Sequence, residues 1–319
     1  MTHYRGQFSS HRLHNSVQMG LIVLGLTVVL AIPAWALAGT TGITWALLLV
    51  IVSMALASTV PPRLVLARAG AGLVLPEQAP QLYEILKQLY ERAGLTVKPM
   101  LYFVPDPRLN AFAVGGRHDG GIAVTEGLLR HLNLRQLAGV LAHEVCHLRH
   151  NDTRVMAMAA SMTHLTAFGA TIVQIVLILM LPWMLAGELM IHWLVLLGAA
   201  FAPSLSTVLQ LALSRNREFT ADLEAAALTG DPRGLAAALK VLEHNHGGWL
   251  ESLFGIPRRR NAPAWMQTHP PTGERIRRLL SLESSRPTHP LADMPDYESI
   301  TIHIPTRPQA RALREWLWR

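Results

Sequence analysis

The spacing of charged residues leaves two long apolar stretches in the chain. No Asp, Glu, Lys or Arg occurs between Arg12 and Arg63, and Glu188 is the only one between Arg154 and Arg215. A bilayer core takes about 20 apolar residues per helix, so each stretch is long enough for two spans. The pattern predicts four membrane-spanning helices, near residues 17–37, 43–60, 164–186 and 190–210.

The flanks of these spans predict their orientation. A cleaved signal peptide is the alternative for residues 1–37, because Arg5 and Arg12 precede the apolar run. The length of that run, and the second apolar segment directly behind it, favour a retained helix. Positive charges lie at the outer ends of both pairs of spans, whereas the short hairpins within the pairs carry no Lys or Arg. The positive-inside rule then places both termini and both hydrophilic regions in the cytoplasm.

Two hydrophilic blocks remain, at about residues 61–160 and 211–319. Neither holds a complete set of catalytic groups, so we expect one domain that is interrupted by the second pair of spans. In the first block, apolar residues at helical spacing predict an amphipathic helix from Pro76 to Gly94. Short apolar runs bounded by Pro and Gly then predict a small sheet, with strands at Met100–Val104, Ala111–Val114 and Ile122–Thr125.

The next predicted helix carries a metal-binding spacing. Asn133 can cap this helix through Gln136, and its C-terminal half contains the sequence His143-Glu144-Val145-Cys146-His147. The two histidines are one turn apart on one face, which suits tetrahedral zinc with one open position. Glu144 beside them could accept the proton of a zinc-bound water that attacks a peptide carbonyl. The alternative is a polar helix face with a chance pair of histidines.

A third ligand is available after the second pair of spans, where Glu218 and Asp222 share a helix face. If Glu218 binds zinc, Asp222 can accept a hydrogen bond from a ligand imidazole and fix its tautomer. The alternative is a solvated face on which the two carboxylates pair with Arg215 or Arg217.

Composition agrees with a membrane protein and excludes some classes of function. Hydrophobic residues make up 50% of the 319 residues and charged residues 15%, with a net charge of +7. The basic residues are scattered and do not form a known nucleic-acid-binding motif, so we expect contact with anionic lipid and no nucleic-acid partner. The single cysteine, Cys146, excludes an internal disulfide and points away from the metal by helical phase, so we interpret it as packing.

Three motifs together resemble the HtpX-like family of membrane zinc metalloproteases, which also includes the CAAX prenyl protease. They are the histidine motif of residues 143–147, Arg217-Glu218-Phe219-Thr220-Ala221-Asp222, and Thr268-His269-Pro270-Pro271-Thr272-Gly273-Glu274-Arg275-Ile276. The segments Asn110-Ala111-Phe112-Ala113 and Gly121–Gly127 also match, as does Asp152. The resemblance covers about residues 60–285 and implies a multi-pass protein of the bacterial inner membrane.

The resemblance also implies roles for individual residues. His143, His147 and Glu218 would bind one Zn²⁺ per chain, with Glu144 as the general base. The strand of Asn110, Ala111, Phe112 and Ala113 would line the cleft and hold an extended substrate by backbone pairing. His269 would stabilise the oxyanion, and the supporting residues would be Asp222, Asp152 and Arg275.

The predicted fold is therefore a mainly α membrane protein, with about four transmembrane helices and a zincin-like α+β metalloprotease domain that contains a small sheet. We predict a transmembrane hairpin at 1–60, protease segments at 61–160 and 211–285, a second hairpin at 161–210, and a linker and tail at 286–319. The tail would lie at the membrane interface or dock as an ordinary helix.

The predicted function is cleavage of membrane or misfolded proteins at the cytoplasmic face, as part of quality control. The partners would be protein or peptide substrates and membrane lipid, and the oligomeric state stays open. One alternative is an intramembrane protease of the site-2 type, but the charged residues Arg149, Asp152 and Arg154 place the motif at the membrane surface. Another is a zinc-binding scaffold or regulator without turnover, which the presence of Glu144 disfavours.

Overall fold

The computed structural model describes residues 61–187, 193–245 and 272–283, and before them residues 20, 24–25, 27–31, 34–35, 38–53 and 55–56. Its internal contacts divide the chain into two units. The first consists of Met1–Thr59 and Val155–Ser214, and the second of Val60–Arg154 and Arg215–Arg319. Every described residue of the predicted site belongs to the second unit.

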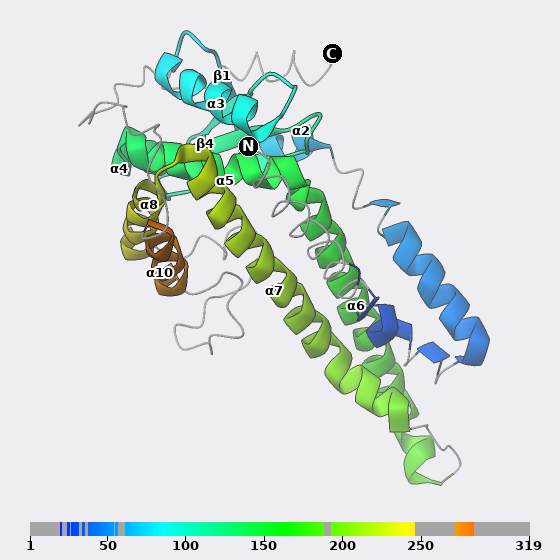
Figure 1. Ribbon diagram of the computed structural model, residues 1–319. Coiled ribbons are helices and arrows are strands. Elements are labelled where there is room, and N and C mark those ends of the chain that lie inside the picture. The colour runs from blue at the N-terminus through cyan, green and yellow to red at the C-terminus, as the bar shows by residue number, and fades with distance from the viewer. Residues whose placement is uncertain are drawn as a thin grey trace. The chain divides into compact units, whose positions relative to one another are not determined.

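The second unit contains a four-stranded mixed sheet in the order β1-β2-β4-β3. Its strands are β1 (Gly72–Val74), β2 (Leu101–Val104), β3 (Ala111–Val114) and β4 (Gly121–Thr125), and β2 and β4 are parallel while the other pairs are antiparallel (Figure 1). The three predicted strands are confirmed to within one residue. The sequence pattern missed β1, because three residues are too few to show an alternation. β3, the predicted substrate strand, lies at an edge of the sheet.

Six helices lie wholly in the described part of the second unit: α2 (Pro62–Arg68), α3 (Pro80–Ala93), α4 (Glu126–His131), α5 (Leu134–His150), α8 (Pro232–Asn245) and α10 (Thr272–Glu283). The predicted helix from Pro76 begins only at Pro80. The helix begins later than predicted because the Gln78 side chain accepts a hydrogen bond from the N–H of Leu75 and forms a turn. Pro80 then suits the first helical position. Gly94, with φ +67°, ends the helix as predicted.

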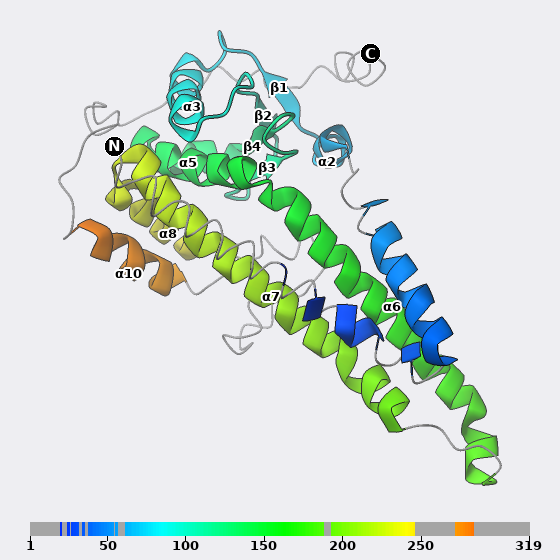
Figure 2. The same cartoon turned by 45° about the vertical axis from the view of Figure 1, so that its right-hand side comes forward.

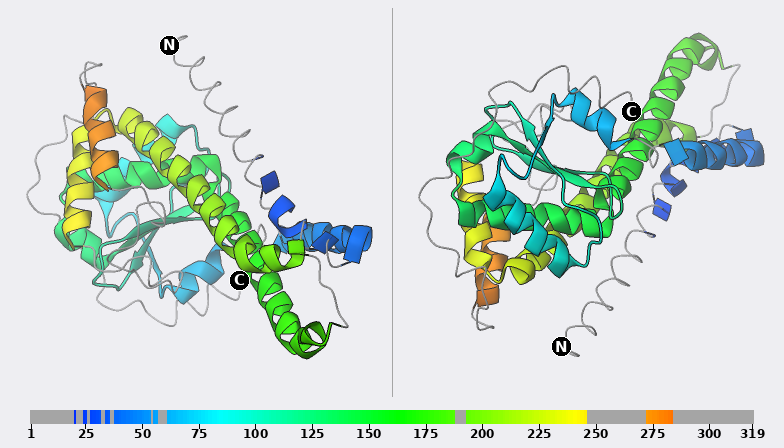
Figure 3. Two further views of the ribbon diagram at one scale, coloured as in Figure 1. Left: turned by 90° about the horizontal axis from the view of Figure 1, so that it is seen from below. Right: turned by 90° about the horizontal axis from the view of Figure 1, so that it is seen from above.

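The sheet separates two apolar layers of the second unit. The helices α3 and α5 lie on one face of the sheet and α2 lies on the other (Figures 2 and 3). Leu101 and Ile122 belong to the apolar core on the α3 and α5 face, and Leu66 of α2 packs with Tyr102 and Ala123 on the opposite face. The helices α8 and α10 extend the first layer, because α8 packs on α5 and α10 packs on α8.

Close approach of α5 and α8 depends on one glycine. A Cβ at Gly139 would lie 2.9 Å from the backbone of Leu235, so any side chain there would push α8 away from the metal-motif helix. The capping box that opens α5 is confirmed, since Asn133 and Gln136 each accept the backbone N–H of the other. At the other end, Asn151 adopts a left-handed φ of 54°. A single residue therefore separates α5 from the next helix.

The apolar part of the chain forms long helices. Among the described residues, α6 (Asp152–Leu185) is the one helix that is long and apolar enough to cross a membrane, and Ala38–Ser53 is a shorter apolar helix. The mainly helical fold with a small sheet is confirmed, whereas the four spans stay a prediction. The last long helix, α7 (Trp193–Thr229), continues well past the predicted end at residue 210. It continues because residues 204–229 contain no Gly or Pro, and it ends at Gly230 with φ +70°.

Candidate metal centre

The helix α5 brings His143, Glu144 and His147 into a buried site. The two histidines are one helical turn apart, and their Nε2 atoms lie 3.1 Å from each other. The rings meet edge to face, with centroids 4.7 Å apart. Both His143 and Glu144 are buried. Polar side chains at this depth require partners, because an unpaired buried polar group is costly.

The helix α7 contributes Glu218 to the same point. Its Oε2 lies 3.4 Å from Nε2 of His143, and its Oε1 lies 3.9 Å from Nε2 of His147. Ligand atoms from these three residues all lie within 4.8 Å of one another. The structure thus brings together the three predicted metal ligands from two helices, although His143 and Glu218 are 75 residues apart in the chain.

A carboxylate and an arginine stand behind His143. Its Nδ1 lies 3.1 Å from Oδ1 of Asp222, although the direction departs from that of a regular hydrogen bond. Asp222 in turn accepts two hydrogen bonds of 2.7 Å from the guanidinium of Arg275 on α10. The same guanidinium lies 3.1 Å from Oε2 of Glu218. Arg275 therefore connects two of the predicted site carboxylates.

A second chain of contacts stands behind His147. Its Nδ1 lies 2.9 Å from Oδ2 of Asp152, and Oδ1 of Asp152 accepts a hydrogen bond of 2.6 Å from Arg217. Sequence reasoning assigned Asp152 a supporting role but missed Arg217, which it weighed only as the partner of a solvated carboxylate. The position of Arg217 beside Glu218 was a weak signal. Nothing in the spacing shows that its side chain reaches a residue 65 positions earlier.

The donor set fits zinc. Because Nδ1 of each histidine faces a carboxylate, we assign the ring proton to Nδ1 in both. When neither Nε2 atom carries a proton, their lone pairs face each other at 3.1 Å, an arrangement that favours a cation between them. Two ligand atoms of a tetrahedral zinc site are separated by about 3.3 Å. The observed separations of 3.1, 3.4 and 3.9 Å lie close to that value.

The electrostatics of the site also favour a divalent cation. The described residues place four carboxylates and two arginines in it, namely Glu144, Asp152, Glu218, Asp222, Arg217 and Arg275. Burial lowers the pKa of His143, but the carboxylates of Asp222 and Glu218 outweigh it and raise the pKa to about 10. The pocket thus attracts positive charge, which a bound metal ion would supply.

Glu144 also contacts the sheet edge. Its Oε2 accepts a hydrogen bond of 2.8 Å from the backbone N–H of Ala113 on β3. The backbone N–H and C=O groups of successive strand residues point to opposite sides of the strand. Those of Ala111 and Ala113 therefore point away from β4. Further along, the hydroxyl of Thr153 donates to the carbonyl of Gly115, and at the strand start Asn110 pairs with Thr125. The predicted substrate strand therefore runs directly beside the predicted general base.

Other polar candidates fall outside this cluster. His150 pairs with Glu224, whose Oε2 lies 2.8 Å from its Nε2, and Cys146 is fully buried in the apolar core as expected. Burial raises the pKa of the Cys146 thiol far above its usual value, so the thiol stays protonated. The predicted oxyanion residue His269 and the C-terminal tail lie outside the described residues.

Comparisons with known proteins agree with this arrangement. Residues 76–283 match the model of peptidase family M48. A protease HtpX homolog of Acaryochloris marina is 41% identical over 244 residues, which cover 72% of this chain and 80% of the relative. The homolog of Nostoc punctiforme is 33% identical over 294 residues, 86% of this chain and 98% of that relative.

A similar fold occurs in the crystal structure of S. mikatae Ste24p. The TM-score is 0.51 at 16% sequence identity, and the match covers 86% of this chain and 66% of the other. The extent of the family match and the identity to curated relatives settle the classification: this chain belongs to peptidase family M48 and is a metalloprotease.

Proposed function

We propose that this protein is a zinc-dependent endopeptidase of the bacterial inner membrane, which cleaves membrane or misfolded proteins at the cytoplasmic face. The observation that carries the proposal is the convergence of two imidazoles and a carboxylate beside Glu144, which itself contacts β3, the edge strand of the sheet formed by the described residues. A metal-binding scaffold would close its coordination with a fourth protein ligand. Here the residue next to the proposed ligands is Glu144, whose carboxylate is suited to proton transfer.

Each residue of the cluster has a distinct part in the proposed reaction. His143, His147 and Glu218 would hold zinc, which supplies a water of lowered pKa and polarises the substrate carbonyl. Glu144 accepts the proton of the attacking water and later delivers it to the leaving amine. Asp222 and Asp152 keep the proton of each imidazole on Nδ1, so that both Nε2 atoms stay available as ligands.

The sheet edge provides the means to hold a peptide. An extended substrate would add to β3 as a further strand, and it would use the outward backbone groups of Ala111 and the carbonyl of Ala113. The N–H of Ala113 is taken by Glu144. The bond to be cleaved would thereby be aligned with the general base by main-chain contacts. Such contacts read backbone rather than sequence, which suits a protease for misfolded proteins.

The mechanism is tested by replacing Glu144. The Glu144→Ala variant should retain zinc, while the rate of cleavage of a membrane-protein reporter falls by roughly 100- to 10,000-fold through loss of proton transfer. Metal analysis and cleavage assays on the purified full chain, in detergent and in nanodiscs, provide the measurement. The matched variant is Glu218→Ala, which should lose zinc as well as activity. Unchanged cleavage by Glu144→Ala would exclude the assigned mechanism, and full zinc occupancy in Glu218→Ala would exclude the third ligand.

The proposed location can be tested separately. The positive-inside pattern places both termini and the protease unit in the cytoplasm. Reporter fusions at either terminus should therefore be active only in their cytoplasmic form. A terminus reported on the opposite side would exclude this topology without bearing on the chemistry of the site.

A further inference from the structure

Exposed apolar side chains of the second unit gather in one short segment. Among the described residues of the second unit, five large apolar side chains are exposed. Three of them are Leu64, Leu73 and Leu75, with exposed fractions of 50%, 47% and 50%. The other two, Leu223 and Leu280, lie on α7 and α10. Scattered single leucines are normal on a protein surface, whereas a cluster indicates a contact.

Leu64 and Leu73 lie on the same side of the sheet, and Leu75 lies just beyond the end of β1. Leu73 pairs with Tyr102, so it projects from the face that α2 covers. On α2, Leu66 is buried against the sheet, which turns Leu64 outward. We call Leu64, Leu73, Leu75 and the two exposed arginines of α2, Arg63 and Arg68, the α2 surface.

The chemistry of the α2 surface fits lipid head groups. Arg63 is the first charged residue after a run of 50 uncharged or histidine residues that begins behind Arg12. In membrane proteins the first arginine after an apolar span marks the level at which the chain leaves the hydrocarbon. Arg68 lies one turn after Leu64 and thus on the same outward face of α2. Outward leucines beside arginines are the composition of an interfacial segment that binds anionic lipid.

We propose that the α2 surface rests on the lipid bilayer, with its leucines at the boundary between head groups and acyl chains and its arginines at the lipid phosphates. The occupant is lipid rather than protein because the segment follows directly on an apolar run and carries the charge that anionic lipid attracts.

The proposal has a consequence for substrate choice, which rests on the proposed function. β3 belongs to the same sheet, and the side chain of Phe112 packs against the apolar cluster that Leu66 of α2 belongs to. A sheet whose α2 side lies on the bilayer presents the edge strand β3 close to the membrane surface. The substrates that reach this edge most readily are stretches of membrane proteins that lie immediately outside a span.

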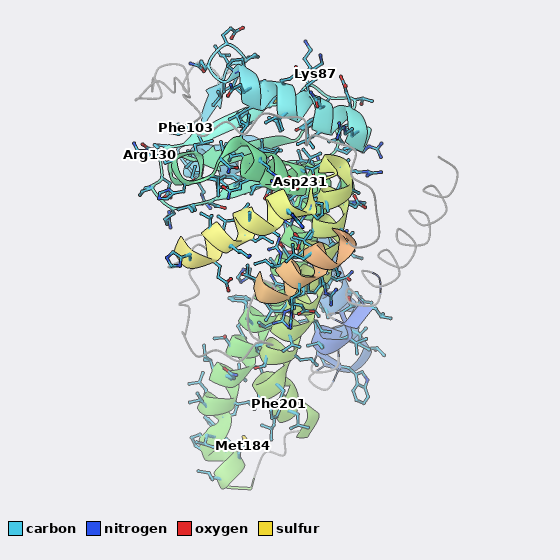
Figure 4. All side chains as sticks on the ribbon, turned by 60° about the vertical axis from the view of Figure 1, so that its left-hand side comes forward. Lys87, Phe103, Arg130, Met184, Phe201 and Asp231 are labelled. Atoms are coloured by element: carbon cyan, nitrogen blue, oxygen red, sulfur yellow. The ribbon has the colours of Figure 1, made fainter. Side chains whose placement is uncertain are left out.

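Lipid contact is tested by spin labelling of the full chain in nanodiscs. Because Cys146 is buried and is the only cysteine, a nitroxide reaches only an introduced thiol. The variants are Leu64→Cys and Leu73→Cys, and the control is Lys87→Cys on the exposed side of α3, across the sheet from α2 (Figure 4). In nanodiscs with anionic lipid, the ratio of collisions with oxygen to collisions with a water-soluble nickel chelate should be severalfold higher at 64 and 73 than at 87.

Two outcomes would overturn the proposal. Free access of the nickel chelate to positions 64 and 73 would show that the α2 surface faces water. Protection from both oxygen and the chelate would show that protein covers it, whether another segment of this chain or a partner. The measurement requires no catalysis and can be repeated on the Glu144→Ala background. A failure of the proposed protease activity therefore leaves it interpretable.

The consequence for substrates is tested with the double variant Leu64→Ser and Leu73→Ser. Cleavage of a reporter whose site directly follows a transmembrane segment should fall by about tenfold, because polar side chains weaken the contact with the bilayer. Hydrolysis of a water-soluble peptide should be unchanged, which also shows that the variant is folded. Leu280→Ser is the matched control and should alter neither rate. Equal losses on both substrates would contradict membrane positioning.

Discussion

The two predicted ligand histidines, His143 and His147, are each held by a carboxylate that an arginine contacts in turn, but the two sets of contacts are built from different parts of the chain. Behind His147, the carboxylate of Asp152 follows only five residues later, at the first residue of α6. Behind His143, Asp222 and Arg275 come from α7 and α10, and α10 is held in place by packing on α8, which packs on α5. One histidine is therefore positioned largely by local chain geometry, and the other by the tertiary fold.

The arginines differ in what they hold. Arg275 lies between two carboxylates, with two hydrogen bonds to Asp222 and a third contact to Glu218. Arg217 contacts Asp152, which also has the imidazole of His147 as a partner. Removal of Arg275 would leave two buried carboxylates with less positive charge, whereas removal of Arg217 would leave Asp152 with one partner in place. The two sides of the site should thus respond unequally to equivalent substitutions.

The largest effect is expected for Arg275→Ala. Loss of one partner from a buried ion pair costs about 3–5 kcal/mol of stability, and here Asp222 and Glu218 both lose the same guanidinium. The variant should unfold at a clearly lower denaturant concentration and should bind zinc at least roughly 10- to 100-fold more weakly. Chemical denaturation and competition with a zinc chelator provide the measurements. Stability and affinity equal to those of the parent chain would show that Arg275 does not bind these carboxylates.

A smaller effect is expected for Arg217→Ala. Loss of a hydrogen bond to a charged group costs about 2 kcal/mol, and zinc should dissociate faster because Asp152 no longer holds the His147 ring firmly. Arg217→Lys should restore part of the affinity. A merely structural role of Arg217 would leave metal binding unchanged. The rate of zinc transfer to a chelator therefore distinguishes that role from one in metal retention.

Arg154→Ala is the matched control for Arg217. Arg154 lies in the first turn of α6, but it pairs with the exposed Asp119 rather than with Asp152. It should change stability by less than about 1 kcal/mol and leave zinc dissociation unaltered. If Arg217→Ala behaves like this control, the contact behind His147 has no part in metal retention.

The smallest effect concerns an ion pair outside the site, between Arg135 of α5 and Asp231 at the start of α8. Burial would raise the pKa of Asp231, but hydrogen bonds from Arg135 and the Gly234 N–H outweigh it, so the folded-state pKa lies below the usual value. The stabilisation is therefore present above the unfolded-state pKa of about 4 and is lost as the pH falls through the lower, folded-state pKa.

The matching variant is Asp231→Asn, which retains the capping group of α8 and removes the charge. The difference in denaturation midpoint between parent and variant should be largest near neutral pH and should shrink in acid. A difference that grows as the pH falls would contradict the assignment.

Local periodicity explains what could be predicted. Short apolar runs and the turn residues that bound them located β2, β3 and β4, and the capping box located the start of α5. The spacing of His143 and His147 fixes their common face on any helix, whatever surrounds it. The start of α3, the strand β1 and the full length of α7 were missed, because a side-chain turn, a very short strand and an uninterrupted helix leave little trace in the hydrophobic pattern.

The sequence by itself thus determined one half of the candidate site, together with the apolar stretches that suit a membrane. Only the tertiary structure decided that Glu218 and Arg275 reach that half, that Arg217 binds Asp152, and that Glu144 contacts Ala113. The physical reason is the range of the forces involved. Helical periodicity acts over four residues, whereas the convergence of groups 31 to 132 residues apart depends on how buried helices pack against one another and against the sheet.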